Sequence, residues 1–368
     1  MLFKPTSLYQ FYKRYETLDL TPIHQSNPQP FTMIELEAII GKKTSFLDDQ
    51  LELGYASLQG DLRLREAITT LYEHENPDEI ATFVGAQEAI FCAMYSLLKA
   101  KDKVVAISPI FAPLIATAEE IGCEIDLVSL TPTKDKWVLD LAQLEASIKA
   151  DCKLLIINFP HNPTGAMLTE DELLKIIDIC DQNNCWILSD EVFRGLEFKP
   201  EQRLPAVADL YPQAISIGVL SKSFATPAIR IGWISCQDKM IIERMIEIKS
   251  SFSICTSHID EQFAIHIILQ HEKVWERSRN KVLNNFSNFD RNVTKSHLLS
   301  RFIKPQAGCV CFPLLNDAIL ASDFSEELIQ NKNLMTLPAD LFISSHNGIR
   351  LGFGYDNNSH LISSIFST

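Results

Sequence analysis

Short apolar runs alternate with helical segments through the middle of this chain, and this alternation constrains its fold more than any other feature. The apolar runs cover 82–84, 104–107, 125–130, 154–157 and 186–188, and helical patterns between them include 86–98, 111–121 and 170–182. Such alternation is typical of a mostly parallel sheet that helices cover on both faces. The chain has 368 residues, 46% of them hydrophobic, so it can bury a large core. We therefore predict an α/β fold with a mostly parallel central sheet flanked by helices.

The pattern changes after residue 235, where longer helical segments replace the alternation. We expect these helices at 239–250 and 259–291, and a second region of strands and helices from residue 301. The first residues are aromatic and then proline-bearing, which favours an extended arm. The predicted organisation is therefore an N-terminal arm at 1–35 that packs with the small domain or a partner subunit, a large cofactor-binding domain at 36–255, and a small α+β domain at 256–368.

The charge and cysteine content exclude several classes of partner. A net charge of −14 argues against nucleic acid or an anionic membrane as the main partner. No run of about 18 apolar residues predicts a membrane span, and residues 1–8 do not resemble a secretory signal. Nine cysteines, mostly in apolar runs, predict reduced thiols in a cytoplasmic protein. Cys309 and Cys311 lack a second ligand pair nearby, so we expect no metal site.

Ligands of open α/β sheets bind outside the carboxyl ends of the strands, and two strand ends suggest an anion and a flat ring. Gly85, Ala86 and Gln87 follow the run at 82–84 and open a helix, where free backbone N–H groups can hold a phosphate. An ordinary strand-to-helix turn is the alternative. Phe111 follows the run at 104–107 and could stack on a heteroaromatic ligand, although it could equally be a core residue.

Two further strand ends carry an amide and a carboxylate. Asn162 lies in a proline-rich loop after the run at 154–157, and the prolines restrain its backbone. His161 beside it is interpreted as a structural or surface residue. Asp190 ends the run at 186–188 and needs a positive partner if it is buried. A protonated pyridine nitrogen would serve, while a helix cap or an ion pair with Arg194 is the alternative.

Lys222 lies just beyond a fifth apolar strand, 214–218, between Ser221 and Ser223. A buried amine loses affinity for its proton, and the neutral amine attacks aldehydes to form a Schiff base. Taken alone, the residue could be an ordinary ion-paired lysine. Together with a phosphate cup, a ring stacker, an amide and a carboxylate, however, it completes the set of groups that holds pyridoxal 5'-phosphate. Arg230 would add a cation for the phosphate.

These residues resemble the class I and II aminotransferase family of fold type I pyridoxal-phosphate enzymes. The resemblance rests on motifs in a fixed order between residues 55 and 352. They are Tyr55 with Gly60 and Leu64-Arg65, Asn162-Pro163-Thr164-Gly165, Asp190-Glu191-Val192-Phe193-Arg194, Ser221-Lys222 with Arg230-Ile231-Gly232, and Ile349-Arg350-Leu351.

The resemblance implies a role for each candidate residue. Lys222 would bind the cofactor covalently and later move a proton, and Asp190 would pair with the ring nitrogen. Asn162 would bond the phenolic oxygen of the cofactor and contribute to substrate binding, and Arg350 would grip the carboxylate of the substrate. Residues around the ring and phosphate would be Phe111, Gly85, Ala86, Gln87, Ser221 and Arg230. Tyr55 would reach the phosphate of a neighbouring subunit, which implies a homodimer. Without the resemblance, Arg350 would be interpreted as a surface arginine on a strand.

Three positions depart from the family pattern. Phe193 stands where a tyrosine is usual, Val219 where many members have a phosphate-binding serine, and Ala228 where a glycine is frequent. We expect an aminotransferase that moves an amino group between an amino acid and a 2-oxo acid. The alternatives are a lyase or cyclase that uses the same cofactor, and a non-catalytic effector-binding module. No G-x-G-x-x-G follows a strand, so a nicotinamide dehydrogenase is disfavoured.

Overall fold

The computed structural model describes residues 5–41, 46–47, 50–73 and 76–367. Its largest sheet has eight strands in the order β2-β9-β8-β7-β6-β3-β4-β5. The strands are β2 (Ile80–Val84), β9 (Ile231–Ser235), β8 (Ala214–Val219), β7 (Trp186–Asp190), β6 (Cys152–Asn158), β3 (Lys103–Ser108), β4 (Glu124–Pro132) and β5 (Trp137–Leu139). Neighbours from β8 to β4 are parallel, whereas β9 runs antiparallel to β8 and β2, and β5 runs antiparallel to β4.

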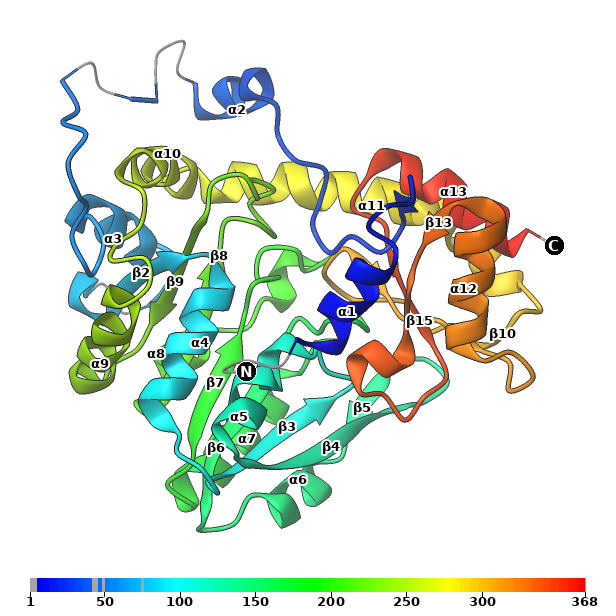
Figure 1. Ribbon diagram of the computed structural model, residues 1–368, viewed down its shortest axis with the longest axis horizontal. Coiled ribbons are helices and arrows are strands. Elements are labelled where there is room, and N and C mark those ends of the chain that lie inside the picture. Colours follow the sequence, from blue (N-terminus) through cyan, green and yellow to red (C-terminus); the bar gives the residue numbers. More distant parts are fainter. Residues whose placement is uncertain (1–4, 42–45, 48–49, 74–75, 368) are drawn as a thin grey trace.

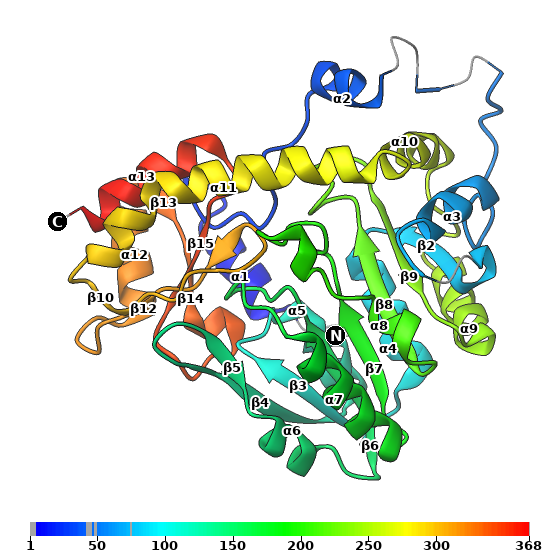
Figure 2. The ribbon, with the colours of Figure 1, turned by 180° about the vertical axis from the view of Figure 1, so that it is seen from behind.

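Helices cover both faces of this sheet, which confirms the predicted fold class. Figure 1 shows α4 (Ala86–Leu97) and α5 (Pro113–Ile121) on the near face, and Figure 2 shows α7 (Glu170–Gln182) and α6 (Leu141–Ser147) on the other. Strands β7 and β8 are buried along their whole length, as expected for a sheet covered twice. The side chains of Thr169 and Glu172 form a reciprocal capping box, so α7 begins where the sequence predicts.

The predicted helix over 259–291 was wrong, because the chain forms two helices there. Helix α10 (His258–Ile268) ends at Leu269, and α11 (His271–Lys295) begins after Gln270 leaves helical geometry. Ala264 and Ile267 of α10 share an apolar core with Leu64 of α3 (Leu62–Thr69), and Trp275 near the start of α11 joins the same core. Further along, α11 packs on α13 (Asp356–Phe366).

The C-terminal region forms a second, smaller body beside the sheet (Figure 1). Its antiparallel sheet has the order β11-β15-β14, and β10 pairs separately with β12. Its elements are β10 (Leu299–Arg301), β11 (Val310–Cys311), β12 (Leu314–Leu315), α12 (Ala321–Lys332), β13 (Leu334–Met335), β14 (Leu337–Pro338) and β15 (Ile349–Gly352). Ser108 at the end of β3 donates its hydroxyl hydrogen to the Ile343 carbonyl at 2.8 Å. The second body therefore packs against the strand end where ligands are expected.

The N-terminal segment crosses from one body to the other. After α1 (Ser7–Arg14), β1 (Thr21–Pro22) pairs in parallel with β13, and α2 (Met33–Ile40) follows. Residues 1–4 of the predicted arm lie outside the described residues. The predicted domain limits, at residues 35 and 255, stay predictions.

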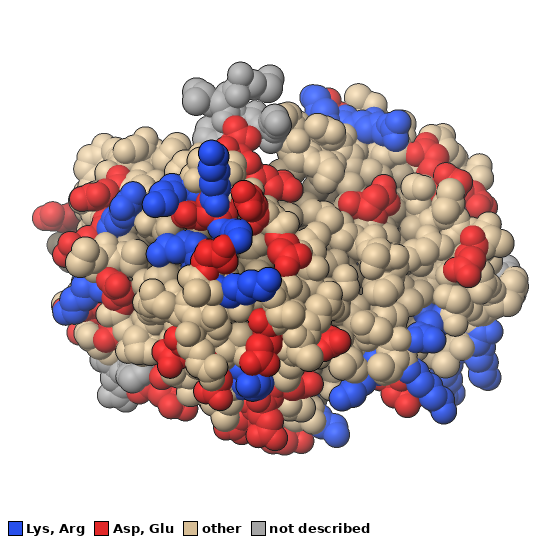
Figure 3. Space-filling view, turned by 90° about the horizontal axis from the view of Figure 1, so that it is seen from below, with Lys and Arg blue, Asp and Glu red and all other residues tan. Residues whose placement is uncertain are grey.

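The surface carries both signs of charge. Figure 3 shows Lys and Arg interspersed with Asp and Glu on the face seen from below, around a broad uncharged area. In the described part of the chain, no helix combines the length and the apolar character that crossing a membrane requires.

Candidate functional site

Lys222 lies in a turn directly after β8. The turn is closed by hydrogen bonds from Thr226 N to the Leu220 carbonyl and from Ala225 N to the Lys222 carbonyl. The half-buried side chain donates from Nζ to Ser26 Oγ at 2.8 Å. Burial lowers the pKa of Lys222 to about 8, and the charges of Arg350, Asp190 and Arg230 also act on this amine. The fold therefore gathers these predicted residues around one amine that is partly neutral near neutral pH.

Asp190 and Asn162 are connected through a third side chain. Asn158 pairs with Asp190 in the register of β6 and β7, and its Nδ2 donates to the Asp190 carbonyl at 2.8 Å. The Asn158 Oδ1 accepts from the backbone N–H of Asn162 at 2.8 Å. This bridge fixes the amide loop against the end of β7. His161 in the same loop is buried and contacts Thr164 Oγ1, so it is structural.

In the part of the chain that the structure describes, the buried Asp190 carboxylate forms no ion pair with Arg194, although the charge of Lys222 acts on it. Its Oδ1 accepts from Val192 N at 3.2 Å, whereas Arg194 donates to the Leu71 carbonyl at 2.6 Å. Burial raises the pKa of Asp190 to about 6. A buried carboxylate is suited to a protonated ring nitrogen, which would supply a positive charge and a hydrogen-bond donor.

Arg350 is not the surface arginine that the strand alone suggests, because it is only 3% exposed. Its Nη1 donates to Asn162 Oδ1 at 3.1 Å, and its guanidinium lies 5.1 Å from the centre of the Phe342 ring. Its Nε is buried and has no hydrogen-bond partner in the described part of the chain. Burial lowers the pKa of Arg350 to about 10. A buried guanidinium with an unused N–H fits a ligand carboxylate.

The predicted phosphate cup has the geometry of an anion cradle. Gly85 precedes α4 with a φ of 79°, and a Cβ there would lie 2.5 Å from Arg230 Nη2. Arg230 Nη1 donates to Ser221 Oγ at 3.0 Å. Ala86 and Gln87 form the first turn of α4, where backbone N–H groups lack partners within the helix. The guanidinium, the hydroxyl and this helix end together fit a phosphate group. Val219, where many family members have a phosphate-binding serine, is buried in β8 and has no hydroxyl. The hydroxyl of this cradle therefore comes from Ser221.

Phe111 and Tyr55 lie differently from the buried cluster. Phe111 is half-buried between β3 and α5 and packs against the main core, so both interpretations of it remain open. Tyr55 is 86% exposed, which separates it from the buried residues around Lys222. Its contact with a neighbouring subunit therefore stays a prediction.

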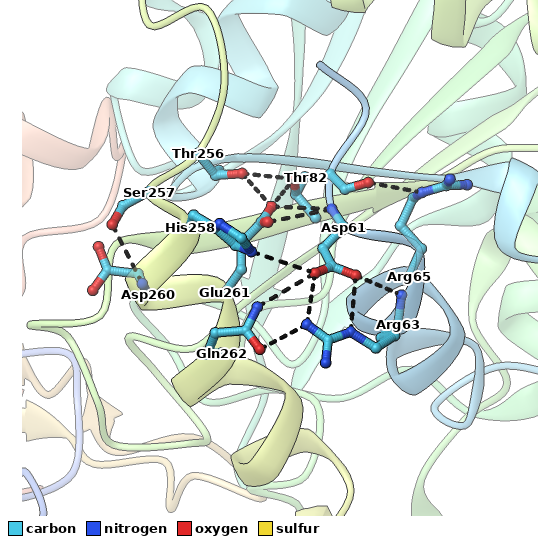
Figure 4. A network of polar contacts seen from close by, with 11 residues as sticks. Asp61, Arg63, Arg65, Thr82, Thr256, Ser257, His258, Asp260, Glu261 and Gln262 are labelled. Carbon is cyan, nitrogen blue, oxygen red and sulfur yellow. Dashed lines mark hydrogen bonds and ion pairs between the residues drawn. The ribbon is translucent and has the colours of Figure 1, made fainter. Parts of the chain in front are cut away.

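The base of the segment that carries Tyr55 is held by polar contacts. Figure 4 shows Glu261 pointing toward Thr82, Thr256 and the backbone of Asp61. The Glu261 carboxylate accepts from Asp61 N and from Thr82 Oγ1, both at 3.3 Å. Gly60, just before Asp61, has a φ of 114°, and a Cβ there would lie 2.4 Å from Thr82 Oγ1. The exposed Tyr55 thus extends from an anchored end.

Sequence reasoning missed three residues that the N-terminal arm brings to the site. Ser26 contacts Lys222, and the charge of Arg350 acts on both His24 and Tyr12. His24 is buried, and burial lowers its pKa to about 3, so its ring is neutral beside Arg350. The prolines at 22, 28 and 30 predict an extended arm, but no local signal shows with which strand the arm pairs.

Comparisons with known proteins show the family of this chain. The family model described as aminotransferase class I and II matches residues 26–362. The probable kynurenine–oxoglutarate transaminase of Saccharomyces cerevisiae is 31% identical over 206 residues, a match that spans 51% of this chain and 46% of that protein. Aromatic-amino-acid aminotransferase 2 of Thermococcus litoralis is 26% identical over 81% of this chain and 79% of that protein.

The fold is also found among solved structures. A PLP-dependent aminotransferase from Streptococcus suis superimposes with a TM-score of 0.90 at 24% identity, and the match covers 100% of this chain and 97% of that one. The order of motifs, the sheet and the matched family model agree over most of the chain. This protein therefore belongs to the class I and II aminotransferase family.

Proposed function

We propose that this chain binds pyridoxal 5'-phosphate and transfers an amino group between an amino acid and a 2-oxo acid. The observation that carries the proposal is the environment of Lys222, where a carboxylate and two guanidinium groups act on one partly buried amine. When bound, the cofactor supplies an aldehyde for that amine and an electron-withdrawing ring for the carbon that loses a proton.

The residues of the chain have separate tasks in this reaction. Arg230, Ser221 and the first turn of α4 bind the phosphate, with Gly85 and its neighbours Ala86 and Gln87 leaving room for it. Asp190 would hold a proton on the ring nitrogen, because a buried carboxylate favours a cation beside it. Asn162 would hydrogen-bond the phenolic oxygen, and Phe111 would pack against the ring.

The substrate is bound by Arg350 and acted on by Lys222. The Arg350 guanidinium grips the α-carboxylate, and this orients the Cα–H bond toward the Lys222 amine. Lys222 would accept the proton from Cα of the substrate and, once protonated, would donate it again. A pKa of about 8 suits this exchange, because the amine can hold or release a proton near neutral pH.

We further propose that the chain acts as a homodimer in which Tyr55 completes the phosphate site of the partner subunit. The supporting observations are the 86% exposure of Tyr55 and the exposure of three apolar residues near it in the sequence, Leu53, Leu58 and Leu62. Exposed apolar groups that lie together mark interaction sites, so this stretch is the candidate for the contact with a partner subunit.

The test is a spectroscopic and product assay on the purified holoenzyme. An amino acid panel is expected to convert the bound cofactor to its pyridoxamine form, with a 2-oxo acid released and no ammonia. Release of ammonia or of an unsaturated product would instead favour the lyase or cyclase. Absence of turnover across the panel would favour the effector-binding module. Borohydride reduction should label the peptide that contains Lys222, and a label elsewhere would contradict the assignment.

A further inference from the structure

The N-terminal arm places a serine hydroxyl against the amine of Lys222. Ser26 Oγ accepts from Lys222 Nζ at 2.8 Å, although the two residues lie far apart in the sequence. In the described part of the chain, this is the one hydrogen bond that the Lys222 amine makes to a side chain. We propose that Ser26 is a positioning residue, which holds the Lys222 amine in the orientation that proton transfer at the substrate requires. The proposal rests on the proposed aminotransferase function.

The backbone around Ser26 is held on both sides, so the hydroxyl has a fixed place. On one side, Ile23 N donates to the Met335 carbonyl at 2.9 Å, and Gly352 N donates to the Ile23 carbonyl at 2.8 Å. On the other side, Gln29 N donates to the Gly354 carbonyl at 2.8 Å. The approach is close, because a Cβ on Gly352 would lie 2.1 Å from the Gln25 carbonyl oxygen. Ser26 is thus fixed relative to β15.

Strand β15 also carries Arg350, so one rigid unit presents both the carboxylate-binding group and the acceptor for Lys222. The proton that Lys222 moves comes from a carbon adjacent to the carboxylate that Arg350 binds. A fixed relation between Ser26 and Arg350 therefore sets the position of the amine relative to that carbon. Proton transfer is sensitive to such geometry, because donor and acceptor must approach within hydrogen-bond distance.

A lysine side chain needs this kind of restraint because it has four flexible methylene groups. Charged neighbours alone do not fix it. The groups that act electrostatically on Lys222 are Cys309 before β11, Arg350 on β15, Asp190 on β7 and Arg230 before β9, and they lie on different elements around it. A hydroxyl acceptor adds direction. It also favours the charged amine, so its loss should lower the pKa of Lys222 further.

The experiment compares Ser26→Ala with Ser26→Thr, which keeps the hydroxyl, and with Asn27→Ala as the matched control. Asn27 lies next in the chain and its Nδ2 donates to Tyr355 Oη at 3.1 Å, so Asn27→Ala loosens the arm but leaves the hydroxyl. The first measurement is the pKa of the Lys222 amine in the full-length, cofactor-free chain. It uses the pH dependence of acetylation by acetic anhydride, with mass spectrometry of the Lys222 peptide. The second uses the holoenzyme and an amino acid deuterated at Cα.

We expect Ser26→Ala to lower the pKa of Lys222 by about one to two units, as the loss of a hydrogen bond to a charged group predicts. We expect kcat to fall about tenfold, with a larger deuterium isotope effect and a KM changed less than about twofold, because general acid–base catalysis contributes more than this when fully lost. Ser26→Thr should restore both quantities, and Asn27→Ala should leave both near those of the unchanged chain.

Three results would overturn the proposal. The first is an unchanged Lys222 pKa in Ser26→Ala. The second is an equal shift of the Lys222 pKa in Asn27→Ala. The third is a rise in KM of Ser26→Ala with kcat unchanged, which would make Ser26 a substrate-binding residue. Failure of the proposed function is distinguishable, because the acetylation measurement needs no turnover. If the unchanged chain turns over no amino acid, the aminotransferase proposal fails, whereas the acetylation measurement still decides whether Ser26 holds the Lys222 amine.

Discussion

Arg350 is expected to destabilise the ligand-free chain while it serves ligand binding, and Arg350→Met should separate these two effects. Burial lowers the pKa of Arg350 from its usual 12.5 to about 10, which corresponds to a penalty on the charge of about 3 kcal/mol. The hydrogen bond to Asn162 and the contact with the Phe342 ring offset about 1 kcal/mol each. Methionine fills similar space without charge, so the variant should gain about 1 kcal/mol.

The assay is thermal unfolding of the cofactor-free chain, alone and with a panel of 2-oxo acids. For a chain of this length, about 1 kcal/mol should raise Tm by about 1 to 2 °C in Arg350→Met. A 2-oxo acid should raise the Tm of the unchanged chain but not that of the variant, because a bound ligand stabilises by mass action. In the holoenzyme the same change should reduce kcat/KM by about 100-fold or more, since a charge-assisted fork is lost.

Arg277→Met provides the matched control, because this arginine is paired. Arg277 Nη2 lies 3.1 Å from Glu35 Oε1, Nη1 donates to the Gln29 carbonyl at 2.6 Å, and the guanidinium lies 4.1 Å from the centre of the Phe31 ring. Its loss should lower Tm. The reasoning is refuted if Arg350→Met melts as low as Arg277→Met, or if a 2-oxo acid still stabilises it.

Three further changes test other parts of the site. The pKa of Asp190 is about 6 in the folded, cofactor-free chain, above its usual 3.8, so folding favours the protonated carboxyl. The free energy of unfolding should therefore fall by up to about 3 kcal/mol as pH rises from about 4 to 6. In Asp190→Asn this fall should be absent, which unfolding measured across this pH range would show. Gly85→Ala should weaken cofactor binding in absorbance titrations, because its Cβ displaces Arg230, and an unchanged Kd would contradict the cradle. Phe193→Tyr should lower the pKa of the lysine–cofactor chromophore by donating to the phenolate, and an unchanged pKa would count against a role for this position.

The strand-end residues could be predicted from the sequence because the register of the sheet brings them together. Lys222, Asp190 and Asn162 each follow a buried strand, and adjacent parallel strands place their carboxyl ends at one edge. The bounds of α7 were predictable for a local reason, since Thr169 and Glu172 cap each other. Both signals lie within a few residues of the feature that they predict.

The contribution of the arm could not be predicted, because it depends on pairing between distant segments. Ser26 and His24 reach the site only because β1 pairs with β13 and the residues after β1 lie alongside β15. Nothing within the arm specifies these partners. The break between α10 and α11 was also missed, because it lies inside a helical pattern that is continuous in the sequence.

The charge of the site opposes the charge of the whole chain, and this gives a prediction with a definite sign. Lys222, Arg230 and Arg350 are cationic groups around one carboxylate, that of Asp190, whereas the chain carries a net charge of −14. An anionic cofactor should associate more slowly at higher salt if these local cations govern its approach, and faster if the overall negative charge does. Charges farther apart than the Debye length, about 10 Å at 0.1 M salt, are largely screened, so the local cations should dominate. Stopped-flow association of pyridoxal 5'-phosphate with the cofactor-free chain should therefore slow as salt rises. Association that accelerates with salt would show that the exposed carboxylates, and not this cluster, control access to the site.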